Sequence, residues 1–382
     1  MESMSFLWET VIPFLVVLTI LVFVHELGHY WVARRNGVRV EVFSIGFGPE
    51  LTGWTDSHGT RWKISAVPLG GYVKMFGESE TVLEDENVER DMTPAERAVS
   101  FHHKSLRQRA AIVFAGPAAN YLFAMIVFAI LFATIGVPQP LEEEPPAVIG
   151  SVFPGSAAAE SGFEVGDQVI RIDGENIYLF SDLHRIVRAN PGKQMEMTVL
   201  RDGQTVAITV TPAAKTETGE GGEEQTVGQL GVGVGGIKFE RQNPIQSVWF
   251  GIERTFVLTY KILEYVWDVI SGRQAADELG GPLRIAQISG QVAQTGLDNL
   301  LTFMAVLSVN LGLINLFPIP MLDGGHLAFY AVEAARGRPL GARAQEYGFR
   351  IGLALVVALF LFVTWNDLVH LKFFEFITGL FT

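Results

Sequence analysis

Two histidines flank a glutamate in HELGH, residues 25–29, where a nearly uncharged N-terminal stretch ends. If this segment is helical, positions four apart share one face, so His25 and His29 can bind a single ion. Glu26 is then placed to accept a proton from a water bound to that ion. Polar groups at membrane depth are costly, and binding a metal offsets part of that cost. The alternative is a helix end at the membrane surface with solvated side chains.

A catalytic zinc site normally uses three protein ligands and one water. The chain has no cysteine, so the third ligand must be a histidine or a carboxylate. The run NLFPIPMLDGGH, residues 315–326, offers Asp323 and His326 at the end of another apolar stretch. We favour Asp323 because the Pro-x-Pro break and the Gly-Gly pair would hold it in a tight turn. His326 would then contact a metal-binding side chain without binding the metal itself, or it would be a polar residue at the membrane edge.

Long uncharged stretches are the elements that must carry these residues. The chain has 382 residues, is 49% hydrophobic and has a mean hydropathy of +0.29, which is too apolar for an ordinary soluble protein. A helix needs about 20 apolar residues to cross a membrane. Four stretches reach this length with their flanks: residues 6–24, 110–137, 299–322 and 351–366.

Positive residues indicate how these spans are oriented. They follow the first span, precede the second and lie between the third and fourth. The positive-inside rule therefore predicts residues 30–109 and 323–350 inside, and residues 138–298 and both termini outside. The first and third spans run in the same direction, which brings Asp323 to the depth of HELGH. The net charge of −13 leaves no basic face, so we expect no nucleic-acid partner.

Between the spans, the sequence predicts β structure and one soluble domain. Residues 61–75 are typical of short strands with glycine turns. Residues 146–212 resemble a PDZ domain of the bacterial protease-associated kind, which binds extended chain ends by strand addition. A generic β-rich domain with Gly-Asp turns is the alternative. Within it we expect strands at 147–152, 195–200 and 205–210 and a helix at 179–189.

The expected fold is a polytopic α-helical membrane protein with four transmembrane helices, a membrane-associated β-hairpin and one extracytoplasmic PDZ domain, β-sandwich-like with helices. A flexible linker is expected at 215–224, and an amphipathic helix on the membrane surface at 244–272. The predicted segments are 1–137 for the first two spans with their β loop, 138–213 for the PDZ domain, 214–243 for the linker and a strand, 244–298 for the surface helix and a Gly-Pro loop, and 299–382 for the last two spans.

These motifs together make the sequence similar to the site-2 protease family of intramembrane zinc metalloproteases, and within it to the bacterial regulator-of-sigma-E protease group. The pattern N-x-x-P-x-P-x-x-D-G is present in full at 315–324. The other matching motifs are HELGH, LGGYVKM at 69–75, AGPAAN at 115–120 and GPLRIA at 281–286. The best-known members of the group carry two tandem PDZ domains, whereas this sequence shows one.

The resemblance implies a zinc-dependent endopeptidase that cleaves transmembrane segments of single-span proteins. It implies that His25, His29 and Asp323 bind Zn²⁺ and that Glu26 is the general base. The implied substrates are anti-sigma factors and remnant signal peptides, already cut outside the membrane by another protease. The implied location is the bacterial inner membrane, with the active site toward the cytoplasm and the PDZ domain in the periplasm. A peptide or protein chain end at the PDZ domain and membrane lipid are the other expected partners.

Further residues are candidates for substrate binding. An unwound substrate helix loses its own hydrogen bonds, which strand addition would replace. Asn310 and Asn315 lie on the third span and could donate amides to the substrate backbone, although a helix–helix hydrogen bond is the alternative. The strand candidates are Gly70, Gly71, Tyr72 and Val73.

Two Gly-Pro pairs could shape access to the site. Gly116 and Pro117 would break the second span near its inner end and make room beside the metal, or else they serve close packing. The family resemblance implies that Gly281 and Pro282 mark a loop that gates entry.

Two rival interpretations exist. The first is a non-catalytic membrane scaffold whose PDZ domain holds partners and whose HELGH is a structural zinc site. The intact Glu26 argues against it, because a structural site needs no base. The second is a zincin that cuts soluble chains, against which the membrane depth of the motif argues.

Overall fold

The computed structural model describes residues 7–78, 92–138, 145–153, 155–218, 224–235, 239–274 and 280–370. Within these ranges, four helices are long and apolar enough to cross a membrane, and each overlaps one of the four predicted apolar stretches. The protein is therefore an integral membrane protein. These candidate spans are Trp8–Arg35, Leu106–Thr134, Leu297–Asn315 and Arg343–Val369.

The described residues form two compact units: the membrane unit, within residues 1–131, 247–263 and 277–382, and the second unit, within residues 132–246 and 264–276. The helices are α2 (Ile12–Arg35, preceded by the π-helical turn Leu7–Val11), α4 (Pro94–Val99), α5 (Leu106–Thr134), α6 (Ala157–Glu160), α7 (Phe180–Arg188), α8 (Pro244–Ile270), α9 (Pro282–Thr295), α10 (Leu297–Asn315), α11 (Asp323–Arg336) and α12 (Ala342–His370). The strands are β1 (Val40–Thr55), β2 (Arg61–Met75), β3 (Val137–Pro138), β4 (Ile149–Val152), β5 (Gln168–Ile172), β6 (Glu175–Asn176), β7 (Met195–Arg201), β8 (Gln204–Val210), β9 (Ala213–Thr218), β10 (Glu224–Gln229), β11 (Val232–Val234) and β12 (Phe239–Glu240).

In the membrane unit, small residues let helices α2 and α5 approach closely. A Cβ on Gly28 would overlap the carbonyl of Ala115 and lie 2.8 Å from Cβ of Ala119. Small residues at such crossings are the usual device for close helix packing in membranes. Pro117 lies inside an uninterrupted α5, so the predicted break in the second span was wrong. Pro117 removes one backbone donor but does not end the helix.

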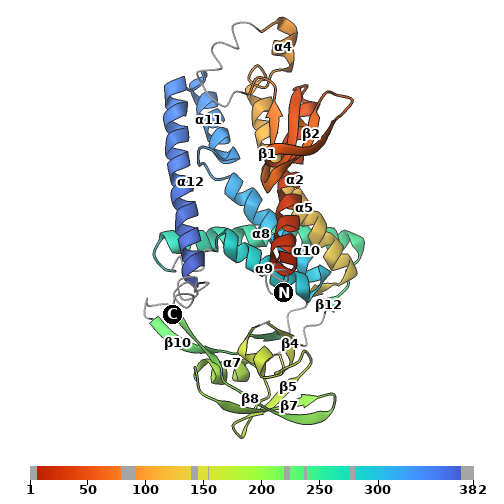
Figure 1. Ribbon diagram of the computed structural model, residues 1–382, viewed down its shortest axis with the longest axis vertical. Coiled ribbons are helices and arrows are strands. Elements are labelled where there is room, and N and C mark those ends of the chain that lie inside the picture. Colours follow the sequence, from red (N-terminus) through yellow and green to blue (C-terminus); the bar gives the residue numbers. More distant parts are fainter. Residues whose placement is uncertain are drawn as a thin grey trace. The chain divides into compact units, whose positions relative to one another are not determined.

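The β1–β2 hairpin packs beside α2 (Figure 1). Its two long strands bend, so that part of β1 pairs with two separate parts of β2. Residues 40–45 of β1 pair with residues 71–75 of β2 on one side and with residues 61–64 on the other. Residues 71–75 are therefore an edge of this small sheet, and no strand among the described residues pairs with their outer side. This edge contains Tyr72 and Val73, two of the strand candidates.

Asp56 anchors the tip of this hairpin to α2. Its carboxylate accepts hydrogen bonds from the Tyr30 hydroxyl and the Trp62 indole, each at 3.0 Å, and from the backbone N–H groups of His58 and Thr60. Burial acts to raise the pKa of Asp56, but these donors outweigh it and lower the pKa from 3.8 to about 2. A carboxyl that binds protons more weakly when folded stabilises the fold above its unfolded pKa.

We therefore expect the hairpin to loosen as the pH falls from about 4 through about 2, where Asp56 becomes protonated. Backbone hydrogen exchange of residues 40–75, measured by mass spectrometry across this range, checks the expectation. Asp56→Asn should show the weakened protection already at neutral pH, whereas Asp202→Asn, in the other unit, should not. Unchanged protection of the hairpin in Asp56→Asn would contradict this role for the carboxylate.

The segment expected to be a Gly-Pro loop begins a helix instead. Pro282 is the first residue of α9, which Figure 1 shows lying crosswise to α2 and α12. Asp367, near the end of α12 and 1% exposed, accepts the backbone N–H groups of Gly281, Leu283 and Arg284 at 2.8, 3.0 and 3.1 Å. A carboxylate at a helix N-terminus satisfies donors that have no partner within the helix. The predicted loop was wrong because α12, distant in sequence, supplies this cap.

A helix, α8, is observed where the sequence predicts the surface helix. Its Ser247, Gly251 and Thr255 are buried. A Cβ on Gly251 would lie 2.7 Å from the carbonyl oxygen of Met125, so this part of α8 crosses α5 closely. Large apolar side chains remain exposed on the rest of the helix, including Ile245, Trp249, Tyr260 and Trp267. The helix is therefore amphipathic, as predicted.

The second unit contains a four-stranded antiparallel sheet in the order β6-β5-β7-β8 (Figure 1). Strands β4, β7 and β8 and helix α7 lie where the sequence predicts them. The unit continues beyond residue 213, because β11 pairs with β4 and Leu230 belongs to the same apolar core. The linker predicted at 215–224 was wrong for its described residues, because 215–218 lie in β9 and Glu224 begins its antiparallel partner β10. Residues 219–223 lie outside the described ranges. Strand β10 of this pair packs against α7.

Candidate metal centre

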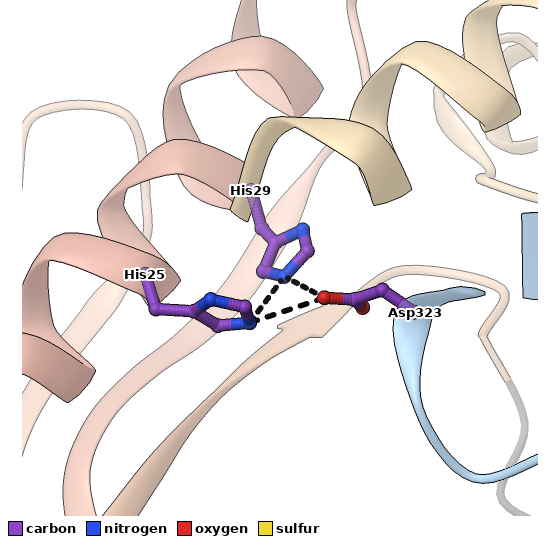
Figure 2. Close-up of side chains that lie close together, drawn as sticks. All are labelled: His25, His29 and Asp323. Carbon is purple, nitrogen blue, oxygen red and sulfur yellow. Dashed lines mark hydrogen bonds and ion pairs between the residues drawn. The ribbon is translucent and has the colours of Figure 1, made fainter. Parts of the chain in front are cut away.

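The two histidines and the aspartate converge on one point (Figure 2). The Nε2 atoms of His25 and His29 are 3.2 Å apart. They lie 3.2 and 3.5 Å from Oδ2 of Asp323, respectively. Zinc ligands at about 2.0–2.1 Å on the corners of a tetrahedron lie about 3.3 Å from one another. The spacing of these three atoms therefore fits a single tetrahedral zinc ion with one position left open.

The orientation of each histidine follows from its helix. Both project from the same face of α2, as the spacing of four predicts, and His25 is 9% exposed. Nδ1 of His29 lies 2.9 Å from the backbone carbonyl oxygen of Ile112 in α5 and can donate to it. That hydrogen bond leaves Nε2 of His29 unprotonated and free to bind a cation. This contact could not be predicted from local sequence patterns, because it depends on where α5 crosses α2.

Asp323 is delivered by a break between two helices. Helix α10 ends at Asn315, and Met321 adopts a positive φ of 96° in the connection. Asp323 is the first residue of α11 rather than part of the turn itself, and the two glycines of the motif lie in that first helical turn. Its Oδ2 is buried and accepts no hydrogen bond from the described groups outside the cluster. Burying a carboxylate is costly unless it is paired or binds a metal, so this oxygen, which faces two ring nitrogens, is suited to bind a cation together with them.

His326, the alternative to Asp323, is not part of this cluster. The group of side chains that could share a metal within the described residues is His25, His29 and Asp323. His326 lies on α11 with its ring against Phe349 of α12, at 5.5 Å between ring centroids. It lines the same cavity as the cluster, so it is a neighbour of the site rather than a fourth convergent group.

A cavity of about 1610 Å³ opens beside the cluster. Glu26 lines it, as do Tyr72, Val73 and Asn315 of the substrate-binding candidates, whereas Asn310, Gly70 and Gly71 are not among its lining residues. The structure therefore brings three of the six candidates to the cavity beside the metal centre.

The strand edge also positions the glutamate. The backbone N–H of Val73 lies within reach of the Glu26 carboxylate. Gly71 packs so closely that a Cβ there would lie 2.9 Å from Cγ1 of Val22 and 3.4 Å from Cγ of Glu26. Val73, proposed from sequence to hold substrate, thus contacts Glu26 directly. Glycine at 71 lets the strand reach the helix that carries HELGH.

Gly116 of α5 lies against the candidate metal centre. The sequence left open whether this glycine makes room beside the metal or serves close helix packing. A Cβ at this position would overlap Nε2 of His29 and lie 2.9 Å from Cε1 of His25. A side chain at position 116 would therefore occupy the space beside the rings of His25 and His29. The motif AGPAAN therefore brings α5 against the metal centre through its glycine.

We expect Gly116→Ala to lower zinc affinity by at least about tenfold, because displaced imidazoles lose the ligand geometry. Zinc retention of the purified variant against a chelator, measured by atomic absorption, checks this. Gly341→Ala is the matched control, because a Cβ there meets nothing within 4 Å. Wild-type zinc retention in Gly116→Ala would show that the overlap is relieved without cost.

An HExxH helix joined by a distant aspartate, within an apolar helical bundle, defines a membrane protein with the metal site of the zinc metalloproteases. The chain belongs to peptidase family M50, the site-2 protease family, whose model matches residues 13–359. It is a zinc metalloprotease, in keeping with the zinc dependence of that family.

Relatives match over almost the whole chain. The "Putative zinc metalloprotease Atu1380" of Agrobacterium fabrum is 43% identical over 375 residues, which cover 96% of this chain and 98% of the relative. "Metalloprotease MmpA" of Caulobacter vibrioides is 36% identical, with 97% and 98% covered. "Regulator of sigma-E protease RseP" of Escherichia coli is 32% identical over 461 residues, with 95% and 99% covered. Among solved structures, a PDZ domain from Listeria monocytogenes covers 25% of this chain and 93% of its own at 13% identity and a TM-score of 0.19, too low to support an argument.

Proposed function

We propose that this protein is a zinc-dependent endopeptidase that cleaves transmembrane segments of single-span membrane proteins. The observation that carries the proposal is the convergence of His25, His29 and Asp323 at zinc-ligand spacing within apolar helices. Glu26 follows His25 on the same helix and lines the adjoining cavity. The three residues would hold the ion, and Glu26 would act as the general base.

The chain's own groups account for the proton transfers in such a reaction. Zinc, when bound, supplies Lewis-acid activation of water and of the scissile carbonyl. Glu26 accepts the proton of the attacking water and later returns it to the leaving amine. The N–H of Val73, which lies within reach of that carboxylate, would help to position it for both transfers. Peptide hydrolysis then needs no other titratable group from this chain.

The edge of β2 offers a way to hold the substrate. A transmembrane helix must unwind before its backbone can be cut, and the exposed N–H and C=O groups then need partners. Residues 71–75 form a strand edge beside the metal centre, and Tyr72 and Val73 line the cavity. An unwound segment added to this edge would recover its hydrogen bonds, and Asn315, also in the cavity wall, could donate its amide to the same segment. Asn310 remains a candidate for contact with a longer substrate.

The biological setting follows from the relatives and the charge pattern. We assign the protein to the bacterial inner membrane, with the metal centre toward the cytoplasm and the second unit in the periplasm. The second unit would act as a single PDZ domain that binds a chain end. The alignment with the Escherichia coli relative spans 461 residues against 382 here, so that relative carries residues with no counterpart in this chain. Anti-sigma factors and remnant signal peptides, in regulated intramembrane proteolysis, are the proposed substrates.

A cleavage assay with the purified protein in lipid vesicles tests the proposal. The substrate is a single-span segment with a reporter on each end, compared with an unfolded soluble chain of equal length. We expect a cut within the span, its loss with a zinc chelator, and its recovery when zinc is added. Cleavage of the soluble chain alone would favour a zincin for soluble substrates. Bound zinc with no cleavage of either chain would favour the scaffold with a structural zinc site.

A further inference from the structure

Asn120 of α5 is a fully buried amide that touches the metal centre. It lies four residues after Gly116 and is 0% exposed. Its Nδ2 is 3.2 Å from Nδ1 of His25, on the side of the ring opposite the ion site. Its Oδ1 is buried and has no hydrogen-bond partner among the described groups. A buried amide in a membrane helix is costly, so this orientation toward a ligand requires an explanation.

The two histidines need the same protonation pattern to bind one ion. A ligand nitrogen must be unprotonated, so a neutral imidazole that binds through Nε2 carries its proton on Nδ1. His29 meets this requirement through the carbonyl oxygen of Ile112. His25 has no backbone carbonyl hydrogen-bonded to Nδ1 in the described structure, and the Asn120 amide is the group in reach.

We propose that Asn120 is a positioning residue for zinc, whose side-chain oxygen accepts the Nδ1–H of His25. A half-turn about the last side-chain bond exchanges the amide oxygen and nitrogen without changing the shape of the side chain. Oδ1 then faces Nδ1 of His25, the proton stays on that nitrogen, and the lone pair of Nε2 points at the ion. Such outer partners fix the tautomer and the ring orientation of metal-bound histidines.

The packing role of position 120 is separable from this hydrogen bond. The backbone carbonyl oxygen of Asn120 accepts the hydroxyl of Ser308 in α10 at 2.9 Å. That bond joins α5 to α10 and does not involve the amide. Leucine has nearly the shape of asparagine and would keep the packing while removing the acceptor. Aspartate would keep an acceptor and remove the amide donor.

The inference rests on the proposed zinc site, and the test separates the two. Zinc affinity is measured by competition with a fluorescent chelator for the wild type, Asn120→Leu, Asn120→Asp and the control Ser308→Ala, all purified in detergent as full chains. Failure of the wild type to bind zinc defeats the site itself. With wild-type binding established, we expect Asn120→Leu to lose about 10–100-fold in affinity, and Asn120→Asp and Ser308→Ala to retain wild-type affinity.

Two further readouts exclude a merely structural effect. The melting temperature of metal-free Asn120→Leu should match that of the metal-free wild type. The visible absorption of the Co²⁺-substituted protein should shift in Asn120→Leu and not in Ser308→Ala, because it reports the ligand field at the ion. Wild-type zinc affinity in Asn120→Leu would overturn the inference. An equal loss in Asn120→Asp would also overturn it, because that result identifies the amide N–H as the group that matters.

Discussion

Glu26→Gln is expected to abolish cleavage of the transmembrane substrate while leaving zinc bound. Glutamine keeps the size of the side chain and a carbonyl oxygen but cannot accept the proton of the attacking water. Loss of a general base costs about 10²- to 10⁴-fold in rate. The three atoms that converge at the metal centre belong to other residues, so zinc content should stay at one ion per chain.

The measurement pairs initial cleavage rates in lipid vesicles with zinc content on the same preparations. Glu253→Gln, an exposed glutamate on α8, is the matched control and should cleave at the wild-type rate. Cleavage at an undiminished rate in Glu26→Gln would remove the general base from the mechanism. Loss of zinc together with activity would mean that Glu26 helps to hold the ion, contrary to the three-residue ligand set of His25, His29 and Asp323.

Asp323→Ala is expected to remove zinc as well as activity. The variant leaves two imidazoles on one helix, and two ligands do not complete a site of this kind. The loss of affinity should exceed the roughly 10–100-fold typical of an outer hydrogen-bond partner. Chelator competition measures the affinity, and the cleavage assay should show no product above background at limiting zinc.

His326→Ala is the matched control for Asp323→Ala, because it lies three residues on, lines the same cavity and was the competing ligand candidate. It should retain zinc affinity close to that of the wild type. The opposite pattern, with zinc lost in His326→Ala and kept in Asp323→Ala, would require a different ligand set from the one in the structure.

The sequence predicts the parts of the centre that depend on local spacing. His25 and His29 share a helix face by periodicity alone, and the depth of Asp323 follows from counting spans and charges. The four membrane helices follow from runs of apolar residues, which leave little ambiguity once they reach the thickness of a bilayer. Strands β7 and β8 follow from alternation and turn residues in the same way.

Features that depend on tertiary crossings could not be predicted in this way. The contacts of Ile112 and Asn120 with the histidines depend on which face of α5 meets α2. The cap that Asp367 places on α9 joins residues more than 80 positions apart. The pairing of β9 with β10 falls partly within the predicted linker, and it depends on the partner strand and on α7, which packs against β10.

X-ray absorption at the zinc edge, on purified protein with a single-crystal anomalous map if crystals are available, tests the central claim most directly. The account predicts one zinc per chain, bound by two imidazole nitrogens and a carboxylate oxygen at about 2.0–2.2 Å, and located between α2 and the start of α11. Zinc at any other position, or a first shell without the carboxylate of Asp323, would contradict it.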